Sequence, residues 1–437
     1  MTTLCRRSLL ALLVGLCAST AAAAPAPGAA PTSLAAPAPA RPQVDARDLL
    51  TLPQLFDLLK RDSPRFRALQ TDIDVARAES RAARVLPNPV MNLAILYLNS
   101  GFNQNGVATY YANFTLPLLV GGQRRFRVKS ANAWSRAAEA EVLSGYHDLA
   151  HAARTLFVEL QAAQERVVTY DRALAELAAL EAFVAGRRQA GFESEVEVLR
   201  VAMAAASWQV RRIEAVTAGE ELSARLAGLV GRPTWRPRAA GEFAPLGVQP
   251  DTAALWAEAR RTQPAIEAAR LREAHAVQGV ALARREAVPV PALTAGTVVI
   301  QNYYSVSTTV GVTVPIPMFD WGQGLRARAE ARSIASRRER EAVSAEVEAE
   351  LTRGAQLLTL RRDALASYER EVLGKADRMH ALVDDAFRTG KAVPDDLLEA
   401  AEIRFDALLT HVDMKAAVMQ AEVDVLAAAG RVEEQVR

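Results

Sequence analysis

The sequence predicts an all-α-dominated α+β fold in which two copies of one structural unit follow each other along the chain. Three observations carry this prediction. Sequence landmarks recur at a spacing of about 200 residues, two proline-free segments are far longer than ordinary helices, and each half contains a pair of short alternating segments. The composition agrees with long helices, since Ala, Leu, Arg and Glu dominate and aromatic residues make up only 6% of the chain.

The duplication is defined by landmarks that occur in the same order in both halves. They are 63–64 (SP) with 263–264 (QP), 86–89 (LPNP) with 288–291 (VPVP), 116–118 (LPL) with 314–316 (VPI), 122–123 (GQ) with 322–323 (GQ), Gly191 with Gly390, and more weakly 226–231 with 426–430. Repeated order at a near-constant spacing indicates tandem duplication. We therefore predict a first repeat over 48–231, an equatorial linker over 232–250 and a second repeat over 251–437.

Helices dominate both predicted repeats. The expected helices are 48–86, 122–190 and 195–230 in the first repeat, and 252–287, 322–389 and 394–430 in the second. In the first long helix, apolar residues from Tyr146 to Leu177 are spaced alternately by three and four. In the second, apolar residues recur every seven positions; they are Leu351, Leu358, Leu365, Val372 and Met379. This period predicts left-handed supercoiling against partner helices. At about 1.5 Å per residue, each long helix would span about 100 Å, which suits crossing a gap.

Two strand pairs are expected, at 90–118 and 292–315. In 109–118, Tyr110, Phe114 and Leu116 fall on one face, whereas 292–301 alternates poorly. Each segment has about ten residues, the length of a tilted membrane-spanning strand, although ordinary soluble hairpins are an alternative. Four strands cannot close a membrane barrel by themselves, and lipid offers no partner to an open edge. Assembly is therefore expected, and three copies would supply 12 strands.

The beginning of the chain predicts export. Residues 1–24 contain two arginines, a short apolar run and small residues, as in a signal peptide. Residues 25–47 are rich in Ala and Pro and predict a flexible lead-in. Cys5 and Cys17, the only cysteines, lie in the signal, so disulfides and thiolate metal sites are not expected in the mature chain. A net charge of +2 gives no reason to expect nucleic acid as a partner.

Four segments together resemble the TolC outer-membrane efflux family: the strand pairs with their helix starts at 86–134 and 288–331, and the helix turns at 187–204 and 386–402. The similarity covers nearly everything after residue 48. It implies a homotrimer in the Gram-negative outer membrane, with four strands per protomer in a 12-stranded β-barrel. A long periplasmic α-helical barrel would continue that β-barrel, with an equatorial region built from 232–250 and the two ends of the mature chain.

The resemblance also implies positions for a gate and for docking. Asp396 and Glu399 occupy places where the family has acidic rings that constrict the periplasmic entrance. The alternative is a helix N-terminal role stabilised by the macrodipole, which suits Asp395 better. Ala392 stands where the family often has an arginine of a gate-locking network. Gly191 and Gly390 mark the tips where a periplasmic adaptor would dock, or are plain helix stops.

No catalytic, cofactor-binding or metal-binding residues are predicted. His147 and His151, one turn apart, resemble half of a zinc-protease motif with Asp148 in place of glutamate. A third ligand is not evident, and an exposed helix face is the preferred interpretation.

The predicted function is that of a passive exit duct, without enzymatic activity, in a tripartite efflux system. Its expected partners are two further copies, a periplasmic membrane-fusion adaptor, an inner-membrane pump of RND type and outer-membrane lipid. The segments 86–89 and 315–324 are closer to the branch serving heavy-metal cation exporters. Alternatives are a drug-efflux or type I secretion duct of the same family, or, from another class, a periplasmic coiled-coil adaptor or scaffold.

Overall fold

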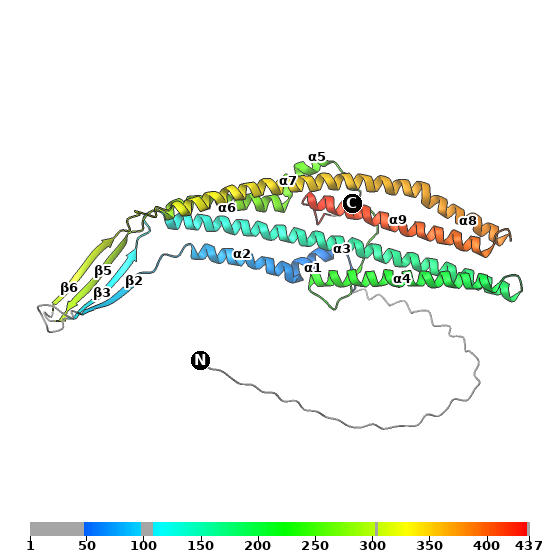
Figure 1. The fold of residues 1–437 in the computed structure, drawn as a ribbon, viewed down its shortest axis with the longest axis horizontal. Coiled ribbons are helices and arrows are strands. Elements are labelled where there is room, and N and C mark those ends of the chain that lie inside the picture. The colour runs from blue at the N-terminus through cyan, green and yellow to red at the C-terminus, as the bar shows by residue number, and fades with distance from the viewer. Residues whose placement is uncertain (1–47, 98–107, 302–304, 435–437) are drawn as a thin grey trace, which may run out of the picture. The chain divides into compact units, whose positions relative to one another are not determined.

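The computed structural model describes residues 48–97, 108–301 and 305–434, which belong to one compact unit (Figure 1). The predicted signal peptide (1–24) and lead-in (25–47) lie outside the described residues. Helices account for most of the described chain, and the four expected strands are present. The predicted fold class is therefore confirmed.

The elements occur in the same order in the two halves. In the first half they are β1 (Leu49–Leu50), α1 (Leu52–Asp62), α2 (Pro64–Ala82), β2 (Val90–Tyr97), β3 (Ala108–Pro117), α3 (Gln123–Gln189) and α4 (Glu195–Val230). After the short strand β4 (Arg238–Ala239), the second half contains α5 (Thr252–Thr262), α6 (Pro264–Glu286), β5 (Ala292–Ile300), β6 (Ser305–Thr313), α7 (Gln323–Tyr368), a π-helical turn (Glu369–Leu373), α8 (Gly374–Arg388) and α9 (Pro394–Ala428).

The helical stretches expected at 48–86 and 252–287 are each divided in two. Proline disfavours the helical conformation in the residue before it, and Ser63, which precedes Pro64, has an extended backbone. The hydroxyl of Ser63 instead accepts a hydrogen bond from the Phe66 amide at 3.5 Å and so caps α2. Gln263, which precedes Pro264, is extended in the same way.

The long helix expected at 322–389 is also interrupted. Whereas α3 continues without a break, the corresponding rod of the second half contains the π-helical turn between α7 and α8. A π turn inserts an extra residue into the helical repeat and so shifts the phase of the side chains that follow. Leu351, Leu358 and Leu365 are buried as the seven-residue period predicts, but Val372, within the π turn, is 41% exposed.

The four long strands form one antiparallel sheet in the order β2-β3-β5-β6. Its register places Met91, Phe114, Ala295 and Val310 opposite one another, so these residues lie on one face. The large apolar side chains of this face are exposed; they include Leu93, Ile95, Tyr110, Phe114, Leu293, Val306, Val310 and Val312. Within the described residues, β2 and β6 each pair on one side only.

The opposite face of the sheet is more polar. Asn92, Asn113, Gly296 and Thr309 form one row across it, and the hydroxyls of Thr115 and Thr294 lie 3.2 Å apart. A Cβ at Gly296 would lie 2.5 Å from the carbonyl oxygen of Ala112, so only glycine fits there. This requirement helps explain why the segment 292–301 alternates poorly in sequence and yet forms β5.

Helix α3 is the centre of the helical part. It packs against α2 and α6 near the sheet and against α4 and α9 further along, while α7 packs against α6 and α9 (Figure 1). Neighbouring helices therefore follow one another in space as α2-α3-α6-α7 near the sheet, and as α4-α3-α9-α8 toward the helix turns. In the described chain, no helix is both long enough and apolar enough to cross a membrane.

The middle of the helical part is held together by a short strand pair and by a buried arginine. The two short strands β1 and β4 pair in parallel. Arg154 of α3 is only 1% exposed and donates hydrogen bonds to the carbonyl oxygens of Val432 (2.6 Å) and Glu434 (3.0 Å). Its burial lowers the pKa of the Arg154 guanidinium to about 10. The chain after α9 is thereby fixed to the centre of α3.

Candidate functional site

The candidate site consists of the two helix turns farthest from the sheet, which we call the tips. The first tip joins α3 to α4 through Gly191, whose φ of 81° lies in the left-handed region. The hydroxyl of Ser194 accepts a hydrogen bond from the Glu197 amide at 3.3 Å and caps α4. Phe192, next to the glycine, is 74% exposed. This tip therefore presents an apolar side chain to its surroundings.

The second tip joins α8 to α9 through Gly390, which has a φ of 70°. The amide of Lys391 donates to the carbonyl oxygen of Ala386 at 2.8 Å, which closes the turn. Pro394 then occupies the first position of α9, where its missing N–H removes no helical hydrogen bond.

The three carboxylates at the start of α9 have different surroundings. Asp396 Oδ2 accepts a hydrogen bond from the Val393 amide at 3.1 Å, so Asp396 caps the helix. Asp395, which the sequence favoured for the N-terminal role, pairs with Arg200 of α4 at 3.0 Å. Asp395 lies in the first turn of α9, as that role requires, but the side chain that reaches back to the free Val393 amide is that of Asp396, at the third helical position. Glu399 is exposed, and among the described residues its carboxylate has no ion pair.

An aromatic core lies directly beneath both tips and fixes them to each other. Phe183 of α3 packs edge-on against Phe387 of α8 with ring centroids 5.1 Å apart, and Trp208 of α4 packs against Phe405 of α9 at 5.9 Å. Leu397 and Leu398 of α9 belong to the same buried cluster. Because these side chains come from all four helices, the acidic start of α9 is held on a rigid support.

A charged cluster lies on the sheet side of this core. Arg404 of α9 pairs with Glu176 of α3 at 3.1 Å and with Asp377 of α8 at 2.8 Å. His380 of α8 lies 2.5 Å from Glu176. This cluster could not be predicted from the sequence, because its members come from three helices and are individually ordinary helix-surface residues.

The two histidines of α3 have separate neighbours. His151 Nε2 lies 3.0 Å from Asp424 of α9. His147 is buried and lies 3.8 Å from Asp148, so the expected exposed helix face is wrong for His147. Across the described ranges, no group of three or more His, Cys, Asp or Glu side chains is arranged to hold a metal ion.

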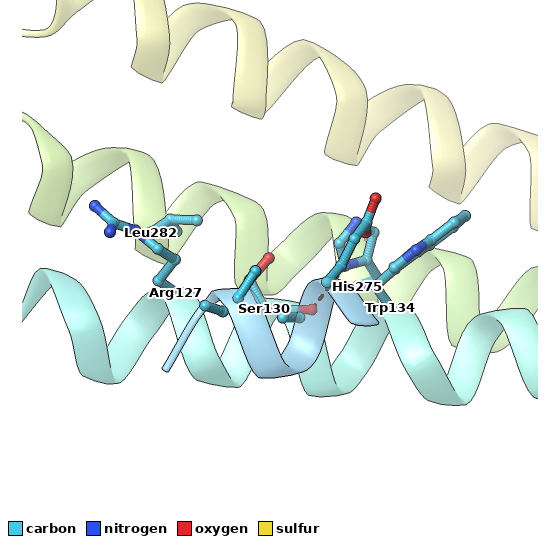
Figure 2. A pocket seen from close by; sticks show the side chains of 9 residues that line it. Arg127, Ser130, Trp134, His275 and Leu282 are labelled. Atoms are coloured by element: carbon cyan, nitrogen blue, oxygen red, sulfur yellow. Dashed lines mark hydrogen bonds between the residues drawn. The ribbon is translucent and has the colours of Figure 1, made fainter. Parts of the chain in front are cut away.

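A surface hollow lies between α2, α3 and α6, close to the sheet rather than to the tips (Figure 2). Its wall includes Trp134 and His275, whose ring centroids lie 5.4 Å apart. His275 Nδ1 lies 3.1 Å from the carbonyl oxygen of Ser130 and therefore carries the proton that it donates. These contacts give His275 a packing role between α6 and α3.

The same architecture occurs in known proteins. The sequence profile of the family described as outer membrane efflux protein matches residues 55–232 and again 255–431. The chain is 24% identical over 391 residues to the cobalt-zinc-cadmium resistance protein CzcC of Cupriavidus metallidurans, covering 89% of this chain and 91% of CzcC.

Two solved structures share the fold. The outer-membrane channel OprN matches with a TM-score of 0.70 and 21% identity, over 87% of this chain and 89% of OprN. CusC, a protein described as forming a transmembrane channel, matches with a TM-score of 0.69 and 16% identity, over 87% and 92% of the two chains. Since the family profile covers most of the chain, and does so once in each half, the chain belongs to the outer membrane efflux protein family.

Proposed function

We propose that this outer membrane efflux protein works as a homotrimer, as the passive exit duct of a tripartite system that exports divalent heavy-metal cations. An inner-membrane pump of RND type would supply the energy, and a periplasmic adaptor would connect that pump to the tips. The observation that carries the proposal is the four-stranded sheet, with one exposed apolar face and a single-sided pairing of β2 and β6.

Closure of the sheet requires further copies of the chain. In the hydrocarbon of a bilayer an unpaired strand edge leaves backbone groups without hydrogen bonds, so β6 of one copy would pair with β2 of the next. Three copies would give 12 strands and a polar lumen lined by rows such as Asn92, Asn113 and Thr309.

The helical part supports the same assembly. One side of α4 carries exposed apolar residues at heptad-like spacing; they are Val196, Leu199, Met203, Val210 and Ile213. An exposed apolar stripe with this period needs a partner helix. Since α4 and α8 are at opposite ends of the helix order, α4 of one copy would pack against α8 of the next, where Leu382 is 63% exposed.

The acidic start of α9 is proposed as the periplasmic gate. In a trimer, three copies of Asp396 and of Glu399 would form two rings around the axis. Glu399 suits this role because it is exposed and unpaired among the described residues. In a closed gate the carboxylates of each ring would repel one another, and the rings would attract cations, as carboxylate rings do in cation channels.

The tips are proposed as the docking surface for the adaptor. A Cβ added at Gly191 or at Gly390 would meet no other atom within 4 Å, so both glycines are open to a partner. Small residues at a turn allow close approach of a second helical hairpin. The cargo is proposed from the relative CzcC, whose name refers to resistance to cobalt, zinc and cadmium.

A deletion strain tests the cargo and the class of protein together. Loss of the gene should lower tolerance to cobalt, zinc and cadmium and leave antibiotic tolerance unchanged, with heat-modifiable trimers found in the outer-membrane fraction of the complemented strain. A fall in drug tolerance alone would assign the duct to drug efflux. Soluble monomer in the periplasm would support an adaptor or scaffold instead.

A matched pair of variants tests the assembly. Met203→Glu places a charge on the exposed stripe of α4, and Gln209→Glu places the same charge on the same helix outside that stripe. The first should reduce the yield of heat-modifiable trimer and metal tolerance together, whereas the second should change neither. Equal behaviour of the two variants would show that the stripe is not an interface.

A further inference from the structure

Exposed cations gather where the helices meet the sheet. Six of them are Arg84 after α2, Arg124, Arg125 and Lys129 at the start of α3, Arg285 at the end of α6 and Arg328 at the start of α7, and we call this set the basic belt. All six are exposed, and none takes part in an ion pair within the described residues. The belt is therefore a surface of uncompensated positive charge.

Direct contacts connect these helix ends to one another. Arg124 Nε donates to the carbonyl oxygen of Arg84 at 2.8 Å. Lys129 and Arg285 both lie over the ring of Phe126, at 5.4 and 5.1 Å from its centroid. Arg284 of α6 pairs with Glu330 of α7 at 3.6 Å. The belt thus crosses α2, α3, α6 and α7, and Arg127 in Figure 2 lies in the same region.

Most acids near the belt are already engaged, and Asp320, which has no ion pair within the described residues, accepts a hydrogen bond from the Gly322 amide at 2.9 Å. Glu286 and Glu330 are already paired with Arg127 and Arg284, which are not among the six. The first turns of α3 and α7 contain no acidic residue. Since the N-terminal end of a helix is itself positive, cations there raise the local potential further. This arrangement is unfavourable unless anions from outside the chain are present.

A segment that is apolar except for Asp320 adjoins the belt at the edge of the sheet. Residues 314–321 follow β6, and within them Phe319 is 89%, Ile316 79%, Met318 74% and Trp321 54% exposed. Arg326 lies over the ring of Trp321 at 4.4 Å from its centroid. The equivalent joint of the first repeat, 116–121, contains no aromatic residue. Exposed tryptophan and phenylalanine next to cations are typical of the boundary between lipid and water.

We propose that the basic belt and the segment 314–321 form a membrane-docking surface that binds the phosphate groups of anionic phospholipids in the periplasm-facing leaflet. The apolar face of the sheet would place the belt at the depth of the headgroups, and Phe319 and Trp321 would enter the leaflet beside them. The inference rests on the outer-membrane placement in the proposed function, and it is independent of the cargo and of the gate.

The test uses the full-length protein in vesicles of phosphatidylcholine with added phosphatidylglycerol. The chain has five tryptophans, and subtraction of the signal of a Trp321→Phe variant isolates Trp321. Brominated phosphatidylglycerol should quench Trp321 with an apparent affinity about fivefold or more above that of brominated phosphatidylcholine, since each cation near an anionic membrane contributes about that factor. The preference should weaken in high salt.

A triple variant and a matched control locate the effect. Arg84→Gln, Arg125→Gln and Arg328→Gln remove three belt cations whose side chains make no hydrogen bond within the described chain. In this triple variant, the ratio of the apparent affinity for phosphatidylglycerol to that for phosphatidylcholine should fall close to one. Arg172→Gln, Arg353→Gln and Arg378→Gln remove three exposed arginines from the parts of α3, α7 and α8 beyond the belt and should leave the preference unchanged.

Four outcomes would overturn the proposal. The first three are equal quenching by the two lipids in the wild-type protein, an unchanged preference in the triple variant, and the same loss in the control. The fourth is altered ion selectivity of the triple variant in a planar bilayer, which would place the belt in the lumen. Metal tolerance measured on the same strains separates a failure of this proposal from a failure of the proposed efflux function.

Discussion

Arg362 of α7 donates a hydrogen bond to the carboxylate of Glu422 of α9, which is completely buried. The same carboxylate accepts hydrogen bonds from three successive amides of the linker before α5, those of Leu246 (2.5 Å), Gly247 (2.9 Å) and Val248 (3.3 Å). One side chain therefore joins both helices to a segment that has no regular secondary structure of its own.

Replacement of Glu422 should destabilise the whole helical part. Glu422→Ala would leave three amides and a guanidinium without their acceptor, and breaking a buried ion pair costs about 3–5 kcal/mol. Glu399→Ala, on the same helix but exposed, is the control. Circular dichroism during heating should show a clear fall in the midpoint for the first variant only, and equal midpoints would contradict this role for Glu422.

Neutralising the proposed gate should weaken cation binding at the tip. Asp396→Asn with Glu399→Gln should raise the cobalt concentration needed to block current in a planar bilayer about fivefold or more, because one charge contact in water is worth about 1 kcal/mol. Asp395→Asn is the control, since Asp395 is already paired with Arg200. Unchanged block in the double variant would remove Asp396 and Glu399 from the pore.

Acid should loosen the chain after α9. Hydrogen bonds from Arg431 hold the pKa of Glu434 below its usual value. A carboxyl group whose pKa is lowered by folding stabilises the folded state above its unfolded pKa, and this contribution is lost as the pH falls through the folded pKa. Proteolysis near 431–434 should therefore accelerate below about pH 4.5. Glu434→Gln should remove that pH dependence, and a variant with the same acid response as wild type would disprove the linkage.

The two joints between strand and helix should differ in their tolerance of a side chain. Gly122 and Gly322 both have positive φ, at 76° and 82°. A Cβ at Gly122 would meet no atom within 4 Å, whereas one at Gly322 would lie 2.3 Å from Ala287 Cβ. Gly122→Ala should cost only the conformational strain of about 1–2 kcal/mol, and Gly322→Ala about 1–3 kcal/mol more through overpacking. Melting temperatures of the two variants measure the difference, and equal values would contradict it.

Much of the architecture could be predicted because it depends on periodicity. Alternation of apolar residues in 109–118 predicts β3, and the spacing from Tyr146 to Leu177 predicts the seam of α3, in which Tyr146, Leu149, Ala153 and Leu177 are buried. Such patterns extend over many residues, so no single exception removes them. The family profile matches each half separately, in agreement with the internal landmarks.

The features that could not be predicted depend on single residues and their distant neighbours. The π turn at 369–373 has no proline or glycine within it, and its signal is a change of phase that only packing reveals. Glu422 is one acidic residue among many on a helix, and its role depends on amides of the linker. Asp395 pairs with Arg200, whereas the adjacent Asp396 caps α9. Which carboxylate takes which role depends on the position of Arg200 on another helix.

The pairing of β3 with β5 joins residues of different repeats, since Pro117 lies opposite Ala292 and Thr109 opposite Ile300. All of α3, α4, α5 and α6 lies between them in the chain, so this pairing can form only after β5 has been synthesised. Contacts so distant in sequence form slowly. Until then the hairpin of β2 and β3 has two unpaired edges and an exposed apolar face, the combination that promotes aggregation. Shielding of the first hairpin by a chaperone until β5 arrives would therefore suppress aggregation during biogenesis of the protein.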